Sequence, residues 1–149
     1  MLEIIAVGTL GKGYQSLCVE YQKRLKVRLK ITTLDIKANN SFSHEEVKAR
    51  EEKLIRKAWV PESYKIALDA KGTLLDSPSF SKLIFDKISR QKITLVIGGA
   101  FGLSATLLQD FDTILSFGRF TWPHQMVQLM LIEQLYRAEA IYHNHPYHK

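Results

Sequence analysis

The sequence has only one cysteine, Cys18, among its 149 residues. A lone thiol excludes a disulfide or a cysteine-ligated metal site within one chain, and the helical pattern around Cys18 predicts a small core side chain. No apolar run approaches the roughly 20 residues that span a bilayer, and the first residues, MLEIIAVG, lack the basic region of a signal peptide. We therefore expect a soluble, cytoplasmic protein.

Linker-like composition is also absent. The chain has four prolines and eight glycines, and no repeat, low-complexity tract or Pro/Ser-rich stretch divides it. Its 46% hydrophobic content is enough for one substantial core. The expectation is a single domain over residues 1–149.

Acidic residues are outnumbered, because 21 Lys and Arg stand against 15 Asp and Glu. The resulting net charge of +6 suits a polyanionic partner such as RNA. It suits an ordinary solvated surface equally well, so charge by itself leaves both interpretations open.

Strand-like and helix-like segments alternate along the chain. Five runs are typical of strands, and the third is expected to end before Lys71: LEIIAVG, LKITTLDI, YKIALDA, ITLVIGG and DTILSFG. Between them, Ser43 and Glu46 have the spacing of a capping box, Pro78 suits the first position of a helix, and Ser104 can cap a short one. The order βαβαβαβαβα predicts an α/β fold with a mostly parallel sheet and helices on both faces.

One expected helix, EEVKAREEKLIRKAW, is unusually charged. Glu46 with Arg50 and Glu52 with Arg56 are i,i+4 pairs of opposite charge. This pattern predicts a solvated helix face rather than a binding site.

The unusual residues follow strands. Ligands of parallel sheets bind beyond the carboxyl ends of the strands, and LDAKG, GGAFG and FGRFTWPH lie at three such ends. Gly98, Gly99 and Gly102 lack the G-x-G-x-x-G spacing of dinucleotide folds and the Lys-Ser/Thr of a P-loop. They either make the strand-to-helix turn or let a ligand approach the main chain.

The stretch FGRFTWPHQM brings three aromatic residues, an arginine and a histidine to the start of the last helix. Aromatic faces stack on purines and arginine binds carboxylate or phosphate, so this loop suits a nucleoside-containing ligand. Core packing of Phe117, Phe120 and Trp122 is the alternative.

The last helix is expected to begin near Pro123 and is apolar on nearly every side. A helix of this kind is buried on more than one side, so we expect a homodimer. The chain then ends in YHNHPYHK, whose histidines lack acidic or cysteine companions, and no metal is expected. This tail either binds an aromatic, anionic substrate or is a disordered terminus.

Together, LVIGGAFGLS, LSFGRFTWPHQM, LIEQLYRA and HPYHK resemble the bacterial ribosomal RNA large subunit methyltransferase H family, within the SPOUT superfamily of α/β-knot methyltransferases. The resemblance covers the whole chain. It implies a C-terminal trefoil knot, a pocket for S-adenosylmethionine (SAM) and a homodimer whose interface completes the active site. The implied reaction is methylation of N3 of a pseudouridine in 23S rRNA.

The resemblance also assigns the site residues. Cofactor-binding residues are expected in the loops after three strands: Leu68, Gly98, Gly99, Phe117, Gly118, Arg119, Phe120, Thr121 and Trp122. The substrate base is expected to meet a second set: Glu133, Arg137, Tyr147, His148 and Lys149. Tyr147 and His148 are the expected catalytic residues. His148 is the first choice for the base that takes the imide proton, because the reference pKa of histidine lies near neutrality.

Two positions depart from the family pattern. Phe101 stands where many members have a polar or acidic residue, and Gln128 where many have arginine. The second departure removes a phosphate contact. RNA binding is then expected to rely on other basic residues: Lys12, Arg119, Arg137 and Lys149.

Two other function classes fit parts of the sequence. A non-catalytic RNA-binding module would explain the positive charge, and it predicts salt-dependent RNA binding without saturable SAM binding. A small Rossmann-type oxidoreductase would explain the alternating pattern, but the missing G-x-G-x-x-G after the first strand argues against it.

Overall fold

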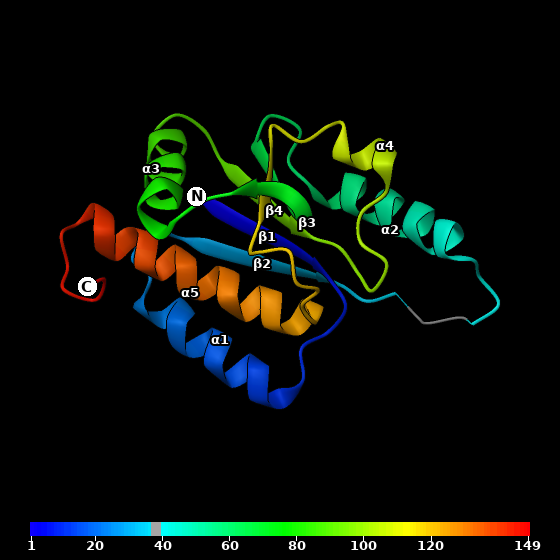
Figure 1. Ribbon diagram of the computed structural model, residues 1–149, viewed down its shortest axis with the longest axis horizontal. Helices are drawn as coiled ribbons and strands as arrows, with labels where there is room; N and C mark the ends of the chain where they lie inside the picture. Colours follow the sequence, from blue (N-terminus) through cyan, green and yellow to red (C-terminus); the bar gives the residue numbers. More distant parts are fainter. Residues whose placement is uncertain (37–39) are drawn as a thin grey trace.

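The computed structural model describes residues 1–36 and 40–149. Strands and helices alternate along this part of the chain: β1 (Leu2–Val7), α1 (Lys12–Arg24), β2 (Leu29–Leu34), α2 (His44–Ala58), β3 (Tyr64–Leu74), α3 (Ser77–Ile88), β4 (Ile93–Ile97), α4 (Ala105–Leu108), β5 (Thr113–Ser116) and α5 (His124–Tyr142). The strands form one parallel sheet in the order β2-β1-β4-β3-β5 (Figure 1). The predicted α/β class is confirmed.

Helices cover both faces of the sheet because successive strand residues point in opposite directions. Ile4 and Leu95 pack in the layer with α1, α3 and α5, whereas Ile5 and Val96 pack in the layer with α2 and α4. The strands are therefore buried on both faces, which explains their near-continuous apolar sequences. Cys18 lies in the first layer, 3% exposed, as predicted.

The helix starts follow the predicted caps with one correction. Ser43 and Glu46 form a complete capping box, and Ser104 caps α4 by accepting the Leu107 N–H. Helix α3 is capped by Asp76, so Pro78 occupies its second position rather than the first. Either position tolerates proline, because the first N–H groups of a helix have no partner within it.

The prediction that β3 ends before Lys71 is wrong, because the strand continues to Leu74. Its pairing with β5 shifts register between Leu68 and Thr73, so the intervening residues leave the ladder and the strand then pairs again. A Cβ on Gly72 would lie 2.6 Å from the Leu115 carbonyl carbon. Only glycine allows the two backbones to approach this closely.

The sequence predicts that the charged residues of α2 face solvent, but two of its carboxylates instead contact other parts of the chain. Glu52 accepts a hydrogen bond from Arg56 at 2.8 Å, as expected, but also from the Ser104 and Thr106 hydroxyls. These hydroxyl bonds lower the pKa of Glu52 to about 2. Glu51, its neighbour, is buried with 5% exposure. The prediction is therefore wrong for these two carboxylates.

Helix α5 packs between α1 and α3 on one face of the sheet (Figure 1). Leu131, Ile132 and Leu135 are fully buried, whereas Met130 is only half-buried. The apolar circumference of α5 is thus not wholly covered within one chain. Within the described ranges, neither α5 nor any other helix has the length and apolar character needed to cross a membrane.

Candidate functional site

A cavity of about 700 Å³ opens at the carboxyl ends of β4 and β5, beside the part of β3 that leaves its pairing with β5. Three segments line it together with Val127 of α5: residues 68–71 of β3, and residues 97–102 and 117–124 without Arg119 at and after the ends of β4 and β5. These segments fall almost wholly within LDAKG, GGAFG and FGRFTWPH, the stretches that the sequence marks as unusual. The size lies within the ~300–1,000 Å³ of typical small-molecule sites.

Glycines shape the loop after β4. Gly102 has φ +75°, and its N–H donates to the Gly99 carbonyl at 3.1 Å, so it makes the turn. A Cβ on Gly98 would lie 2.9 Å from the Leu103 side chain and 3.0 Å from the Gly102 carbonyl carbon. The turn-making role is therefore confirmed for Gly102, and ligand approach at Gly98 and Gly99 stays a prediction.

The loop after β5 is held to the end of β3. Gly118 has φ +114°, and its N–H donates to the Ser116 hydroxyl at 3.1 Å. The Arg119 guanidinium donates to the main-chain carbonyls of Ala70 and Gly72. Arg119 thus connects the loop after β5 to β3 instead of lining the cavity.

Aromatic side chains from this loop stand at the cavity. Phe120 is 78% exposed and Trp122 is 39% exposed, with their ring centres 6.2 Å apart. Core packing is therefore the wrong interpretation for these two rings, although Phe117 does pack against the core. Exposed aromatic faces beside a cavity are available to stack on a planar ligand.

Several lining residues were not among those predicted. His124, in the first turn of α5, is accommodated by Gly8, where a Cβ would lie 2.7 Å from the His124 Nε2. Asp69 and Lys71 also line the cavity, and the Asp69 carboxylate accepts the Lys71 N–H at 2.8 Å. All three residues lie in the stretches that the sequence predicts to follow strands, so this predicted position was the available signal.

The C-terminal tail folds back onto α5. The Tyr147 hydroxyl donates to Glu133 at 2.9 Å, and Arg137 Nε donates to the same carboxylate oxygen at 3.0 Å. Arg137 Nη1 lies 3.4 Å from the His148 Nδ1. Four of the predicted substrate-binding residues thus form one cluster, whereas Lys149 is exposed at the end of the chain. These contacts argue against a disordered terminus.

The environment of Tyr147 indicates that the two expected catalytic residues have different roles. Burial raises the pKa of Tyr147 above its ordinary value, and hydrogen bonds with Tyr21 and Glu133 raise it further. The phenol is therefore protonated at neutral pH and acts as a hydrogen-bond donor. An imidazole is the side chain that accepts protons near neutrality, which leaves His148 as the candidate base in this cluster.

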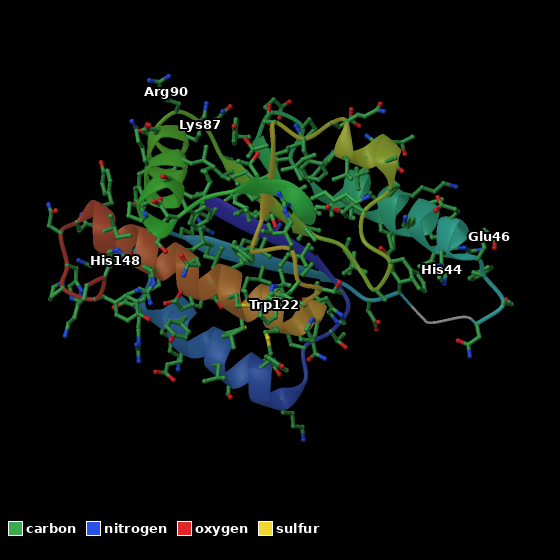
Figure 2. The ribbon with its side chains drawn as sticks, in the orientation of Figure 1. His44, Glu46, Lys87, Arg90, Trp122 and His148 are labelled. Atoms are coloured by element: carbon green, nitrogen blue, oxygen red, sulfur yellow. The ribbon has the colours of Figure 1, made fainter. Side chains whose placement is uncertain are left out.

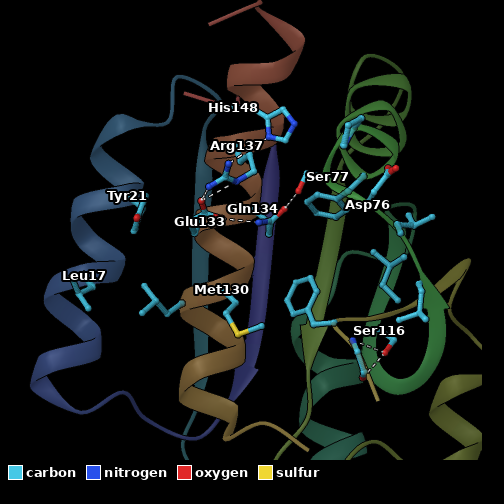
Figure 3. Close-up of a pocket in the computed structure, with 18 residues that line it drawn as sticks. Leu17, Tyr21, Asp76, Ser77, Ser116, Met130, Glu133, Gln134, Arg137 and His148 are labelled. Carbon is cyan, nitrogen blue, oxygen red and sulfur yellow. Dashed lines mark hydrogen bonds and ion pairs between the residues drawn. The ribbon is translucent and has the colours of Figure 1, made fainter. Parts of the chain in front are cut away.

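A second cleft, of about 1020 Å³, runs between α1, α5 and the segment that joins β3 to α3. Figure 3 shows Arg137 and His148 toward one end of it and Ser116 toward the other, with Met130 between them and Leu17 on the side of α1. Phe117 and Gly118 line both this cleft and the first cavity. The two hollows are therefore neighbours across one loop.

The tail cluster and the first cavity lie at different levels of α5. Trp122 precedes the first turn of the helix, whereas His148 lies beside its C-terminal part (Figure 2). From His124 to Arg137 the helix advances about 20 Å, at the usual rise per residue. The tail histidines form no metal-binding group: among the described residues, no set of three or more His, Cys, Asp or Glu is placed to hold an ion.

Comparison with known proteins gives consistent matches along the whole chain. Residues 1–148 match the family model described as "Predicted SPOUT methyltransferase". The chain is 38% identical to the "Ribosomal RNA large subunit methyltransferase H" of Carboxydothermus hydrogenoformans, over 99% of each protein. It is 39% identical to the protein of the same name from Mycoplasmopsis agalactiae, over 99% of this chain and 98% of that protein. The fold also matches the solved structure of a probable methylase family protein from Haemophilus influenzae, with a TM-score of 0.62 at 16% identity, over 99% of this chain and 70% of that one.

Proposed function

Because the chain belongs to the ribosomal RNA large subunit methyltransferase H family of SPOUT methyltransferases, we propose that it methylates 23S rRNA at N3 of a pseudouridine, with SAM as donor. One observation carries the proposal: the chain has both a cavity lined by exposed aromatic rings and glycine main chain, which suits a nucleoside-containing donor, and the Glu133–Arg137–Tyr147–His148 cluster, which suits the substrate base. Each chain thus offers a candidate donor site and a group of proton-handling side chains. Action on ribosomal RNA is the reason to propose a cytoplasmic location.

The residues around the first cavity fit SAM. Phe120 and Trp122 offer exposed rings to a purine, and the Asp69 carboxylate offers an acceptor to ribose hydroxyls or an ammonium group. Gly98 and Gly99 leave main chain without side-chain bulk at the wall. When bound, SAM supplies an electrophilic methyl group, so the protein has to orient the reactants and handle one proton.

The tail cluster suits the second of these tasks. The N3 proton of the base has to leave, and the His148 imidazole is the acceptor we assign to it. The Arg137 guanidinium, oriented by Glu133, stabilises the negative charge that develops on the pyrimidine ring. Tyr147 remains protonated and donates a hydrogen bond.

The separation along α5 bears on how the site is assembled. From Val127, the last residue that lines the cavity, to Arg137, which lies beside His148, the helix advances about 15 Å, which is too far for His148 to take a proton from a base held at its own chain's cavity. The second cleft exposes apolar side chains that a second copy would cover, with Leu17 at 44%, Leu74 at 55% and Leu75 at 40% exposure. We therefore propose a homodimer in which each chain's tail serves the cavity of its partner.

Replacing Met130, a half-buried residue of this cleft, by aspartate tests the dimer. An unpaired carboxylate in a dry interface is costly to desolvate, so M130D is expected to weaken dimerisation at least ~100-fold and to abolish methyl transfer. Sedimentation velocity measures the assembly state. The matched control is L54D, which adds the same charge at a 40% exposed leucine of α2 on the other face of the sheet. Dimeric, active M130D protein would place the interface elsewhere.

Methyl transfer from labelled SAM to ribosomes and to free rRNA, with the modified base mapped, tests the function itself. We expect label at N3 of a pseudouridine, and saturable SAM binding by calorimetry. Salt-dependent RNA binding without SAM binding would instead identify a non-catalytic RNA-binding module.

A further inference from the structure

Helix α2 contacts the glycine loop, residues 98–102, and the start of α4 at several points. The His44 ring stacks on Phe101, with ring centres 3.8 Å apart and planes 19° from parallel. Glu52 accepts hydrogen bonds from the hydroxyls of Ser104 and Thr106, which begin α4. His44 and Glu52 are about two helical turns apart, so α2 holds this region along much of its length.

Glu51 makes the most intimate of these contacts. Its Oε2 accepts the Gly99 N–H at 3.3 Å, and a Cβ on Gly99 would lie only 2.4 Å from its Oε1. Glu51 is 5% exposed, and one turn further along α2 Ile55 is fully buried, which fixes the helix. The carboxyl therefore packs directly against the main chain of a loop that lines the cavity.

A carboxyl in such a place has an energetic cost. Burial raises the pKa of Glu51, and the Gly99 N–H opposes this rise only in part. An apolar side chain would fill the same space without that cost, but it would leave the Gly99 N–H without this acceptor. The loop would then rearrange toward another acceptor, and the cavity wall would move with it.

We propose that Glu51 is a positioning residue of the methyl-donor site, which accepts the Gly99 N–H from a fixed point on α2 and thereby sets the shape of the glycine loop and its affinity for SAM. The inference rests on the proposed function only in the identity of the ligand. Glu51 itself does not line the cavity. Its effect on the donor passes through the main chain of Gly99.

Two variants of similar volume isolate the hydrogen bond. E51Q keeps an acceptor oxygen and resembles the neutral carboxyl that burial favours, whereas E51L removes the acceptor. We expect the Kd for SAM to rise about tenfold in E51L, the worth of one buried hydrogen bond, and to stay within about threefold of wild type in E51Q. Calorimetry measures the affinity. In NMR spectra, the Gly99 amide resonance should move in E51L and stay close to its wild-type position in E51Q.

E45L is the matched control, because Glu45 lies on the same helix with its side chain 84% exposed. We expect wild-type SAM affinity for it. Wild-type affinity in E51L, or equal weakening in E51L and E51Q, overturns the inference while the proposed function stands. Absence of SAM binding in the wild-type protein overturns the proposed function and this inference with it.

Discussion

A chain that ends at Pro146 is expected to fold, to bind SAM with near wild-type affinity and to lose methyl transfer to the ribosome almost completely. The truncation removes the Tyr147 phenol that donates to Glu133 and the His148 imidazole beside Arg137. No residue beyond Val127 lines the first cavity, so donor binding is expected to survive. Loss of a general base costs ~10²–10⁴ in rate, and loss of the substrate contacts adds to this.

Single substitutions measure how much of the tail's effect on methyl transfer comes from His148. H148A is expected to lower the turnover of labelled SAM by about 100-fold, the lower end for a general base. H143A is the matched control, because His143 is an exposed histidine that contacts Phe85 and Tyr142 outside the cluster. Full activity of the truncated chain would remove the tail from the reaction. Lost SAM binding would instead move it to the donor cavity.

Placing valine at Gly98 is expected to weaken SAM binding at least ~100-fold while the protein stays folded and dimeric. The first added carbon already meets the Leu103 side chain at 2.9 Å and the Gly102 carbonyl carbon at 3.0 Å. Main chain cannot yield as a flexible side chain does, so the loop has to move. Calorimetry with SAM measures the loss, and sedimentation verifies the assembly.

A pair of alanine variants adds the same methyl group in two settings. Gly98→Ala keeps the close contacts and is expected to weaken SAM binding about tenfold, following the usual cost of overpacking. Gly13→Ala, in α1, meets nothing within 4 Å and should leave the affinity unchanged. Unaltered SAM affinity in folded Gly98→Val protein would restrict the glycine to its part in the loop's own packing.

Much of the fold was predictable because its signals are local. Strands buried on both faces need apolar residues at nearly every position, and the capping box of Ser43 and Glu46 acts within four residues. The end of β3 was not predictable from such signals. Its extension past Lys71 depends on renewed pairing with β5, to which Gly72 comes close only in the folded sheet.

The site residues likewise divide into those that the sequence placed correctly and those that it did not. The strand-end position and the resemblance led to Leu68, Gly98, Gly99 and most of the 117–122 stretch, all of which line the cavity. Arg119 faces the Ala70 and Gly72 carbonyls instead. Placement of these residues agrees with the predicted roles without testing them, and the trefoil knot likewise stays a prediction.

By itself, the sequence determined the order and class of the elements, the edge of the sheet where the cavity lies, and the family. These follow from periodicity, turn chemistry and short motifs, which act between residues near each other in the chain. Only the tertiary structure decided which polar groups meet. Glu51 reaches Gly99 across 48 residues, and Tyr147 reaches Glu133 through the fold of the tail. A carboxylate on a charged helix has the same sequence pattern whether it faces water or a buried amide, because burial depends on the element packed against it.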